Sequence, residues 1–284
     1  MLLHRWQKWA YYSQWVIAAG AAAQCFETVI RLQLPHLNPW FYVLIFTCTL
    51  LQYMLHFRFF IFSKLTNQRQ LFFAGHQPFL WGQLVLAAIA FTASFIVAGS
   101  ALIVPLVCFG LLAGAYSFFL LRPRRHGIFR YHGLFKILTL TITWAGVTGV
   151  LPVLAAQQVA SHPVYLFHFM MRWLMMLAIC LPFDARDVER DRRNGTVTIP
   201  AIIGIKNAFF VCYGCILLNI FMVGLSVIWG WNTRPVAIAN GLANVVMLAS
   251  IWYSSRHLTH EFSWFLLDAN FVIHALIVTA ILWY

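Results

Sequence analysis

Four of the seven acidic residues of the chain lie within eight consecutive positions, in the segment FDARDVERD. If this segment is helical, Asp184, Asp187 and Asp191 share one face, because they are spaced i, i+3 and i+7. Carboxylates this close repel one another unless a cation or nearby arginines neutralise them. Oxygen ligands suit Mg²⁺, which binds through one or two carboxylates together with substrate phosphates. These three residues therefore predict a catalytic magnesium site for a diphosphate.

The alternative is a solvated segment in which the aspartates pair with the neighbouring arginines. Four arginines are available for this, namely Arg186, Arg190, Arg192 and Arg193. An isolated DxxDxxxD in a soluble protein would favour this alternative. The gathering of most of the chain's acids at one edge of an apolar segment favours the metal site instead.

The composition excludes a soluble domain. Apolar residues make up 62% of the chain, charged residues only 9%, and the mean hydropathy is +0.79, whereas soluble domains are about half apolar and a quarter charged. A transmembrane helix needs about 20 mostly apolar residues. Stretches of that length predict about nine transmembrane helices at 10–30, 38–62, 79–99, 101–121, 134–155, 163–183, 205–230, 235–254 and 262–284. Because only short connections remain, we expect an all-α polytopic membrane protein with a single domain, 1–284.

The positive charges alternate between the two ends of these helices. Sixteen Lys and Arg residues fall in the amino terminus and in every second connection, against Arg31 and Arg234 on the other side. This positive-inside pattern predicts a cytoplasmic amino terminus and an external carboxyl terminus in a bacterial inner membrane. It also explains the net charge of +12 without nucleic acid as a partner.

Two further stretches accompany the acidic segment. It is followed by Gly195, by Thr196-Val197-Thr198-Ile199-Pro200 and by Gly204, and the segment YSFFLLRPRR begins at Tyr116. These patterns resemble the UbiA superfamily of intramembrane prenyltransferases: its second aspartate-rich motif, the Thr-x-Pro and Gly that trail it, and its Tyr-Ser stretch leading into basic residues. The resemblance covers nearly the whole chain.

The resemblance implies a UbiA-like bundle that transfers a prenyl group from a polyprenyl diphosphate to a lipophilic acceptor. Ionisation of the allylic C–O bond would give a carbocation, which the acceptor attacks. The implied diphosphate-binding residues are Tyr116, Arg122, Arg124 and Lys136. Mg²⁺ on Asp184, Asp187 and Asp191 is the implied cofactor, and membrane lipid surrounds the protein.

The chain departs from this family at the first aspartate motif. The family has Asn-Asp-x-x-Asp at the end of its second helix, whereas the present chain reads QYMLHFR and has no carboxylate between Glu27 and Asp184. His56 and Arg58 could bind the diphosphate directly, so that cationic side chains replace a metal. Equally, the first site could have been lost.

Several polar residues lie inside the predicted helices. Arg172 falls near the middle of 163–183, where an arginine costs about 3 kcal/mol on insertion scales, so we expect an ion pair with Glu27 or Asp268. Cys212 and Cys215 form a CxxC, which inside a helix favours packing over redox chemistry.

Two alternatives to the enzyme remain open. A non-catalytic descendant could bind a lipid diphosphate or a partner, and the missing first motif favours this. A small transporter could use intramembrane polar residues as a path, although no pair of broken helices supports it.

Overall fold

The computed structural model describes residues 5–60, 68–98, 102–121, 132–159, 162–193 and 196–283, and every regular element in these ranges is helical. Nine long helical segments overlap the nine predicted ranges. Their bounds are α2 Trp15–Arg31, α3 Pro39–Phe60, α5 Gln77–Ala98, α6 Ile103–Leu121, α7 His132–Ala145 with η3 Gly146–Val150 and α8 Leu151–Ala155, α9 Pro163–Arg193, α11 Ile205–Ile228, α12 Arg234–Arg256 and α13 Glu261–Trp283.

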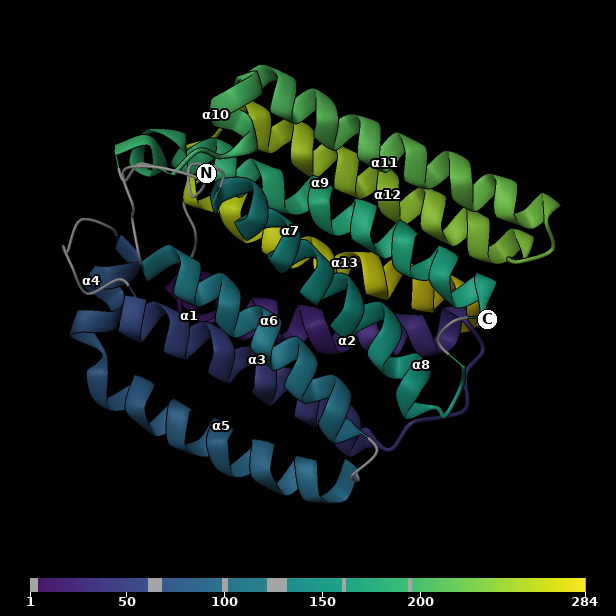
Figure 1. The fold of residues 1–284 in the computed structure, drawn as a ribbon, viewed down its shortest axis with the longest axis horizontal. Coiled ribbons are helices and arrows are strands. Elements are labelled where there is room, and N and C mark those ends of the chain that lie inside the picture. The colour runs from purple at the N-terminus through teal and green to yellow at the C-terminus, as the bar shows by residue number, and fades with distance from the viewer. Residues whose placement is uncertain are drawn as a thin grey trace.

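Three short helices lie between or before the long ones. They are α1 Arg5–Tyr12, α4 Gln68–Gly75 and α10 Ile199–Ile203. Helices α1, α4 and α10 lie at one end of the bundle, and the C-terminus lies at the opposite end (Figure 1). We call these the N end and the C end of the bundle.

The apolar composition of the helices places the chain in a membrane. Six helical segments, including α5, α9 and α13, are long and apolar enough to cross a bilayer. Large apolar side chains such as Ile96, Val104 and Ile228 are exposed on the outside of the bundle, where lipid satisfies them. The chain is an integral membrane protein.

The helices form a closed ring, with neighbours in the order α2, α3, α6, α7, α9, α11, α12 and α13, and with α13 packed back against α2. Helix α5 packs on the outside of α3, at the lower edge of the view (Figure 1). Polar and titratable side chains that face the inside of this ring are shielded from lipid. The ring therefore explains how an apolar chain can hold an internal site.

Three local differences from the predicted spans have physical causes. The first predicted helix divides at Ser13 and Gln14, because Gln14 adopts a left-handed conformation with a φ of 70°. The fifth contains a π-helical turn, η3, which ends two residues before Pro152. Proline has no backbone N–H, so it cannot continue the ordinary α-helical hydrogen bonds. The sixth continues past its apolar part to Arg193, so the acidic segment is helical.

Candidate functional site

A buried ion-pair cluster joins α7 to α9 near the N end of the bundle. The Nζ of Lys136 lies 3.1 Å from Oδ1 of Asp184 and 3.7 Å from Oδ2 of Asp191. The two aspartates occupy one face of α9 two turns apart, and each is only 6% exposed. We call Lys136, Asp184 and Asp191 the Lys–Asp cluster. Two carboxylates and one ammonium leave it with one net negative charge.

The Lys–Asp cluster still has unused acceptors. Oδ2 of Asp184 and Oδ2 of Asp191 are buried and accept no hydrogen bond from the described residues, since 3.7 Å from Lys136 is too long for one. Buried polar atoms normally have partners. Two buried carboxylates that pair with one ammonium and each keep an oxygen without a hydrogen-bond partner suit a further cation that is also bound by a substrate phosphate. The residues present therefore fit one Mg²⁺.

Asp187 takes a different role from the other two aspartates. Its carboxylate accepts hydrogen bonds from Nε and Nη2 of Arg186 at 2.6 and 2.7 Å and from Nη2 of Arg190 at 2.6 Å. Within the described ranges, no three His, Cys, Asp or Glu side chains come together as a metal site. The three-aspartate magnesium site thus stays a prediction, and the geometry supports two of its ligands better than the third.

The segment after α9 holds the start of α7 in place. The N–H of Thr196 donates to the carbonyl of Asp191 at 2.9 Å, which turns the chain back towards α7. At Gly133 a Cβ atom would lie 2.1 Å from the carbonyl oxygen of Val197, so only glycine allows the two backbones to approach this closely. Gly133 precedes Lys136 by one turn, and this contact therefore sets the position of the lysine.

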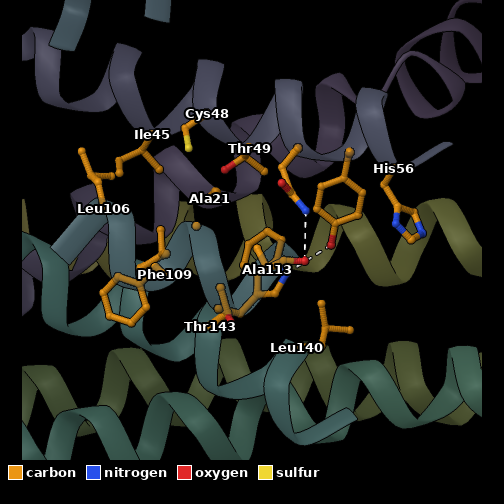
Figure 2. A pocket seen from close by; sticks show the side chains of 15 residues that line it. Ala21, Ile45, Cys48, Thr49, His56, Leu106, Phe109, Ala113, Leu140 and Thr143 are labelled. Carbon is orange, nitrogen blue, oxygen red and sulfur yellow. Dashed lines mark hydrogen bonds between the residues drawn. The ribbon is translucent and has the colours of Figure 1, made fainter. Parts of the chain in front are cut away.

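An apolar cavity of about 110 Å³ opens between α2, α3, α6 and α7. Ala21, Ile45, Leu106, Phe109 and Val147 form its apolar part. Figure 2 shows Cys48, Thr49 and His56 along the α3 wall, with Leu140 and Thr143 of α7 and Ala113 of α6 across from that wall. This mostly apolar space suits hydrocarbon groups.

Helix α7 carries both the cavity wall and the Lys–Asp cluster. Leu140, Thr143 and Trp144 line the cavity and follow Lys136 at i+4, i+7 and i+8, so all four share one face of the helix. Leu140 lies one turn from Lys136, about 6 Å along the axis. The apolar cavity and the charged cluster are thus consecutive along one helix face.

Trp144 is fixed between two partners. Its ring stacks on Phe271 of α13 with a centroid distance of 4.9 Å and an interplanar angle of 7°. Its Nε1–H donates to the hydroxyl of Tyr53 at 3.1 Å, and Nε2 of Gln52 donates to the carbonyl of Ala113 at 3.2 Å, as the dashed lines show (Figure 2). These contacts hold an aromatic wall in one orientation.

The predicted diphosphate-binding residues divide into two groups. Lys136 is in the cluster, and His56 lines the cavity. The side chains of Arg58 and Tyr116, and the whole of Arg122 and Arg124, lie outside the described residues.

Gln52, Tyr53 and Trp144 line the cavity but were not predicted as site residues from the sequence. Trp144 could have been predicted, because it follows Lys136 by eight residues and therefore lies on the same face of the helix. Gln52 and Tyr53 stand in the QYMLHFR stretch, in which the sequence predicted only His56 and Arg58 as binding residues.

Arg172 forms the predicted ion pair, and its partner is Glu27. Nη2 of Arg172 donates to Oε2 of Glu27 and, at 3.0 Å, to the hydroxyl of Thr28. This pair joins α9 to α2 across the ring, far from the Lys–Asp cluster. The buried carboxylate of Glu27 offsets the free-energy cost of placing Arg172 in the membrane, as expected for an arginine at this depth.

Comparison with known proteins gives matches by structure alone. No protein-family model and no curated protein sequence matches the chain. An apo structure of a UbiA homolog from Aeropyrum pernix K1 superposes with a TM-score of 0.63 over 94% of this chain and 98% of that one, at 15% identity. The chain has the UbiA fold.

A second solved structure is similar over almost the same length. It is a digeranylgeranylglyceryl phosphate synthase, with a TM-score of 0.56, 14% identity, and coverage of 94% of this chain and 95% of that chain. The UbiA-like bundle expected from the acidic segment and its trailing motif is therefore confirmed as the fold. At this identity the likeness concerns architecture, and function has to be argued from the site.

Proposed function

We propose that this UbiA-fold protein is a membrane prenyltransferase that moves a prenyl group from a polyprenyl diphosphate to a lipophilic acceptor. The observation that carries the proposal is that one face of α7 holds both sites: the buried Lys–Asp cluster and, one turn further along the helix, the apolar cavity. A prenyl diphosphate has the same two parts, a charged head and a hydrocarbon chain. The fold shared with a digeranylgeranylglyceryl phosphate synthase supports this reading.

The charged head would bind at the Lys–Asp cluster. The ammonium of Lys136 would donate to diphosphate oxygens, while Asp184 and Asp191 would hold Mg²⁺ through the oxygens that have no partner within the described residues. The metal, when bound, supplies positive charge that neutralises the phosphate oxygens. Arg122 and Arg124 are the other proposed contacts to the leaving group, and their guanidinium groups suit phosphate oxygens.

The cavity would hold the prenyl chain and exclude water from its reactive end. The allylic C–O bond breaks, the diphosphate leaves with the bonding electrons, and the acceptor forms the new bond to carbon and releases a proton. Trp144 and Tyr53 line the cavity, and aromatic rings attract cations. These rings would therefore stabilise the allylic cation until the acceptor reacts.

The second candidate is a non-catalytic protein that binds a lipid diphosphate. One observation favours it: the α3 wall of the cavity presents Gln52, Tyr53 and His56, and no residue from 28 to 183 is acidic. A second metal could not be held there by carboxylates. Binding without turnover would follow if one metal and the basic residues are insufficient for ionisation.

The first experiment is binding of radiolabelled polyprenyl diphosphate to the purified protein, with and without Mg²⁺. We expect Asp184→Asn to weaken binding at least about tenfold, because a charge-assisted contact is lost. Glu189→Gln is the matched control, since Glu189 is exposed on the same helix and its ion pair in the described residues is with Arg193, at 3.4 Å. Absence of binding in the wild type under both conditions would refute both candidates.

The second experiment separates the two candidates. Protein loaded with the labelled diphosphate is mixed with a set of lipophilic acceptors, and release of inorganic diphosphate is measured. Release together with a prenylated product supports the transferase. Tight binding with no release for any acceptor supports the non-catalytic protein.

A further inference from the structure

A second charged cluster lies near the C end of the ring and takes no part in the proposed function. Glu27 and Arg31 of α2 and Arg172 of α9 are 0%, 6% and 3% exposed. The two guanidinium groups share one carboxylate: Arg172 is hydrogen-bonded to it, and Nη1 of Arg31 lies 3.8 Å from Oε1. We call Glu27, Arg31 and Arg172 the Arg–Glu cluster, which has one net positive charge.

None of the other acidic side chains in the described part of the chain forms an ion pair with these two guanidinium groups. The six other acidic residues of the chain are at 184, 187, 189, 191, 261 and 268. Asp184 is twelve residues from Arg172, about 18 Å along α9, and Glu261 is paired with Lys8 near the N end. Asp268 precedes His274 by six residues, about 9 Å along α13 towards the N end. An uncompensated guanidinium at this depth is costly.

The end of α2 compensates only part of the charge. Arg31 is in the last turn of α2, where the helix carboxyl end contributes about half a negative charge. Asn240 of α12 accepts a hydrogen bond from Nη1 of Arg31 at 2.9 Å, but its amide is neutral. The Arg–Glu cluster therefore lacks an anion.

The atoms of Arg31 that lack a partner show which anion would fit. Its Nε and Nη2 are buried and donate to no acceptor in the described residues. These two N–H groups form the edge of guanidinium that binds both oxygens of a carboxylate. Arg186 of the same chain uses that edge on Asp187, with distances of 2.6 and 2.7 Å. The corresponding edge of Arg31 has no such occupant.

Other groups around the Arg–Glu cluster also have unused hydrogen-bonding capacity. Nε of Arg172, Nδ1 of His168 and Nδ1 of His274 are buried without a partner in the described part of the chain. The π-helical turn η3 borders this region through Thr148, whose carbonyl accepts from Thr28 at 2.7 Å. Single π-helical turns occur frequently at functional sites. A polar ligand would thus find several groups to bind.

We propose that the Arg–Glu cluster binds a carboxylate ligand, whose two oxygens accept hydrogen bonds from Nε and Nη2 of Arg31. The ligand restores neutrality inside the membrane and is independent of the prenyl diphosphate site. The carboxylate comes either from a small soluble anion that enters at the C end or from a fatty acid of the bilayer. Both sources present the same chemical group to Arg31.

The test is thermal unfolding of the protein in nanodiscs of zwitterionic lipid, titrated with acetate or with oleate against chloride at equal ionic strength. We expect at least one carboxylate to raise the Tm of the wild type in a saturable manner, and the arm that responds identifies the source. Arg31→Gln should lose this rise. Arg234→Gln, an exposed arginine near the same end, should retain it. No rise in the wild type, or an equal rise in Arg31→Gln, would overturn the proposal.

A second variant decides the question if Arg31→Gln does not fold. Asn240→Asp is nearly isosteric and places a carboxylate beside Nη1 of Arg31. We expect it to raise the Tm in carboxylate-free buffer and to reduce the response to added carboxylate. A lower Tm with an unchanged response would show that the Arg–Glu cluster needs no anion.

Discussion

Lys136 sits in the Lys–Asp cluster where a bound cation would also sit. Its ammonium neutralises one of the two buried carboxylates, Asp184 and Asp191, and leaves one net negative charge. A divalent cation brought by a diphosphate would reverse this sign. The same residue therefore stabilises the empty site and contributes to binding the phosphates once the metal is present.

This double role predicts the behaviour of Lys136→Met. Removal of the ammonium leaves the buried carboxylate of Asp184 without an ion-pair partner in the described residues and leaves Asp191 with Arg190 alone, at 3.9 Å. This costs on the order of 3 kcal/mol, so the Tm should fall. Mg²⁺ should recover part of that loss and raise the Tm of this variant more than that of the wild type. Thermal unfolding with and without Mg²⁺ measures both effects, with Lys206→Met, an exposed lysine, as the control. An identical response to Mg²⁺ in variant and wild type would argue against a metal at Asp184 and Asp191.

The three aspartates should differ in their importance. Asp184 and Asp191 have oxygens without a partner in the described residues, whereas Asp187 is hydrogen-bonded to Arg186 and Arg190. We expect Asp184→Asn and Asp191→Asn to weaken Mg²⁺-dependent binding of polyprenyl diphosphate at least about tenfold, and Asp187→Asn to weaken it less. Binding curves for the three variants give the order. A larger loss for Asp187→Asn would restore the three-aspartate site.

Helix α6 allows a test of where the prenyl chain lies. Gly110 lines the cavity, and a Cβ atom there would meet nothing within 4 Å, so Gly110→Leu should fill space without straining the fold. We expect it to lower the affinity for long prenyl diphosphates about tenfold and to affect short ones less. Competition binding with diphosphates of different chain length measures the selectivity.

The neighbouring glycine of α6 supplies the matched control. Gly114 also has no atom within 4 Å of a Cβ but lies outside the cavity lining, so Gly114→Leu should bind all chain lengths as the wild type does. If both variants behave alike, the prenyl chain does not occupy this cavity.

At the scale of helices, the sequence predicts the bounds of a helix well where the length and apolarity of the span determine them. The predicted spans at 79–99, 205–230 and 262–284 differ from α5, α11 and α13 by at most two residues at either end, because a membrane forces each span to satisfy its own backbone. The break at Gln14 and the π-helical turn η3 depend on packing inside the ring. The hydropathy of the sequence does not predict such packing contacts.

The site was predictable in part for a related reason. Acidic residues are rare in this chain, so the group at 184–191 that contains Asp184 and Asp191 stands out in the sequence. Their lysine partner is 48 residues away from Asp184, and Trp144, which lines the cavity, stacks on Phe271 of the distant helix α13. Contacts between distant segments follow from how the ring closes, which no local pattern specifies.

At the scale of the whole molecule, the two charged clusters have opposite signs and lie towards opposite ends of the bundle. The Lys–Asp cluster near the N end has a net negative charge, and the Arg–Glu cluster near the C end has a net positive charge. Along the long direction of the bundle, the apolar cavity lies between the two clusters, because Ala21, which lines it, precedes Glu27 on α2. A prenyl diphosphate would therefore bind with its head at the N end.

This polarity matters for function because it decides which side of the membrane supplies the substrate. The sequence has sixteen Lys and Arg residues in the amino terminus and in every second connection between the predicted spans, against Arg31 and Arg234 on the other side. This predicts a cytoplasmic amino terminus, and α1 lies at the N end (Figure 1). A reporter fluorescent only in the cytoplasm should give signal when fused to the amino terminus, and a phosphatase active only outside should be active at the carboxyl terminus. The reversed pattern would place the diphosphate site outside. Soluble diphosphates made in the cytoplasm could not then reach the site without being transported first.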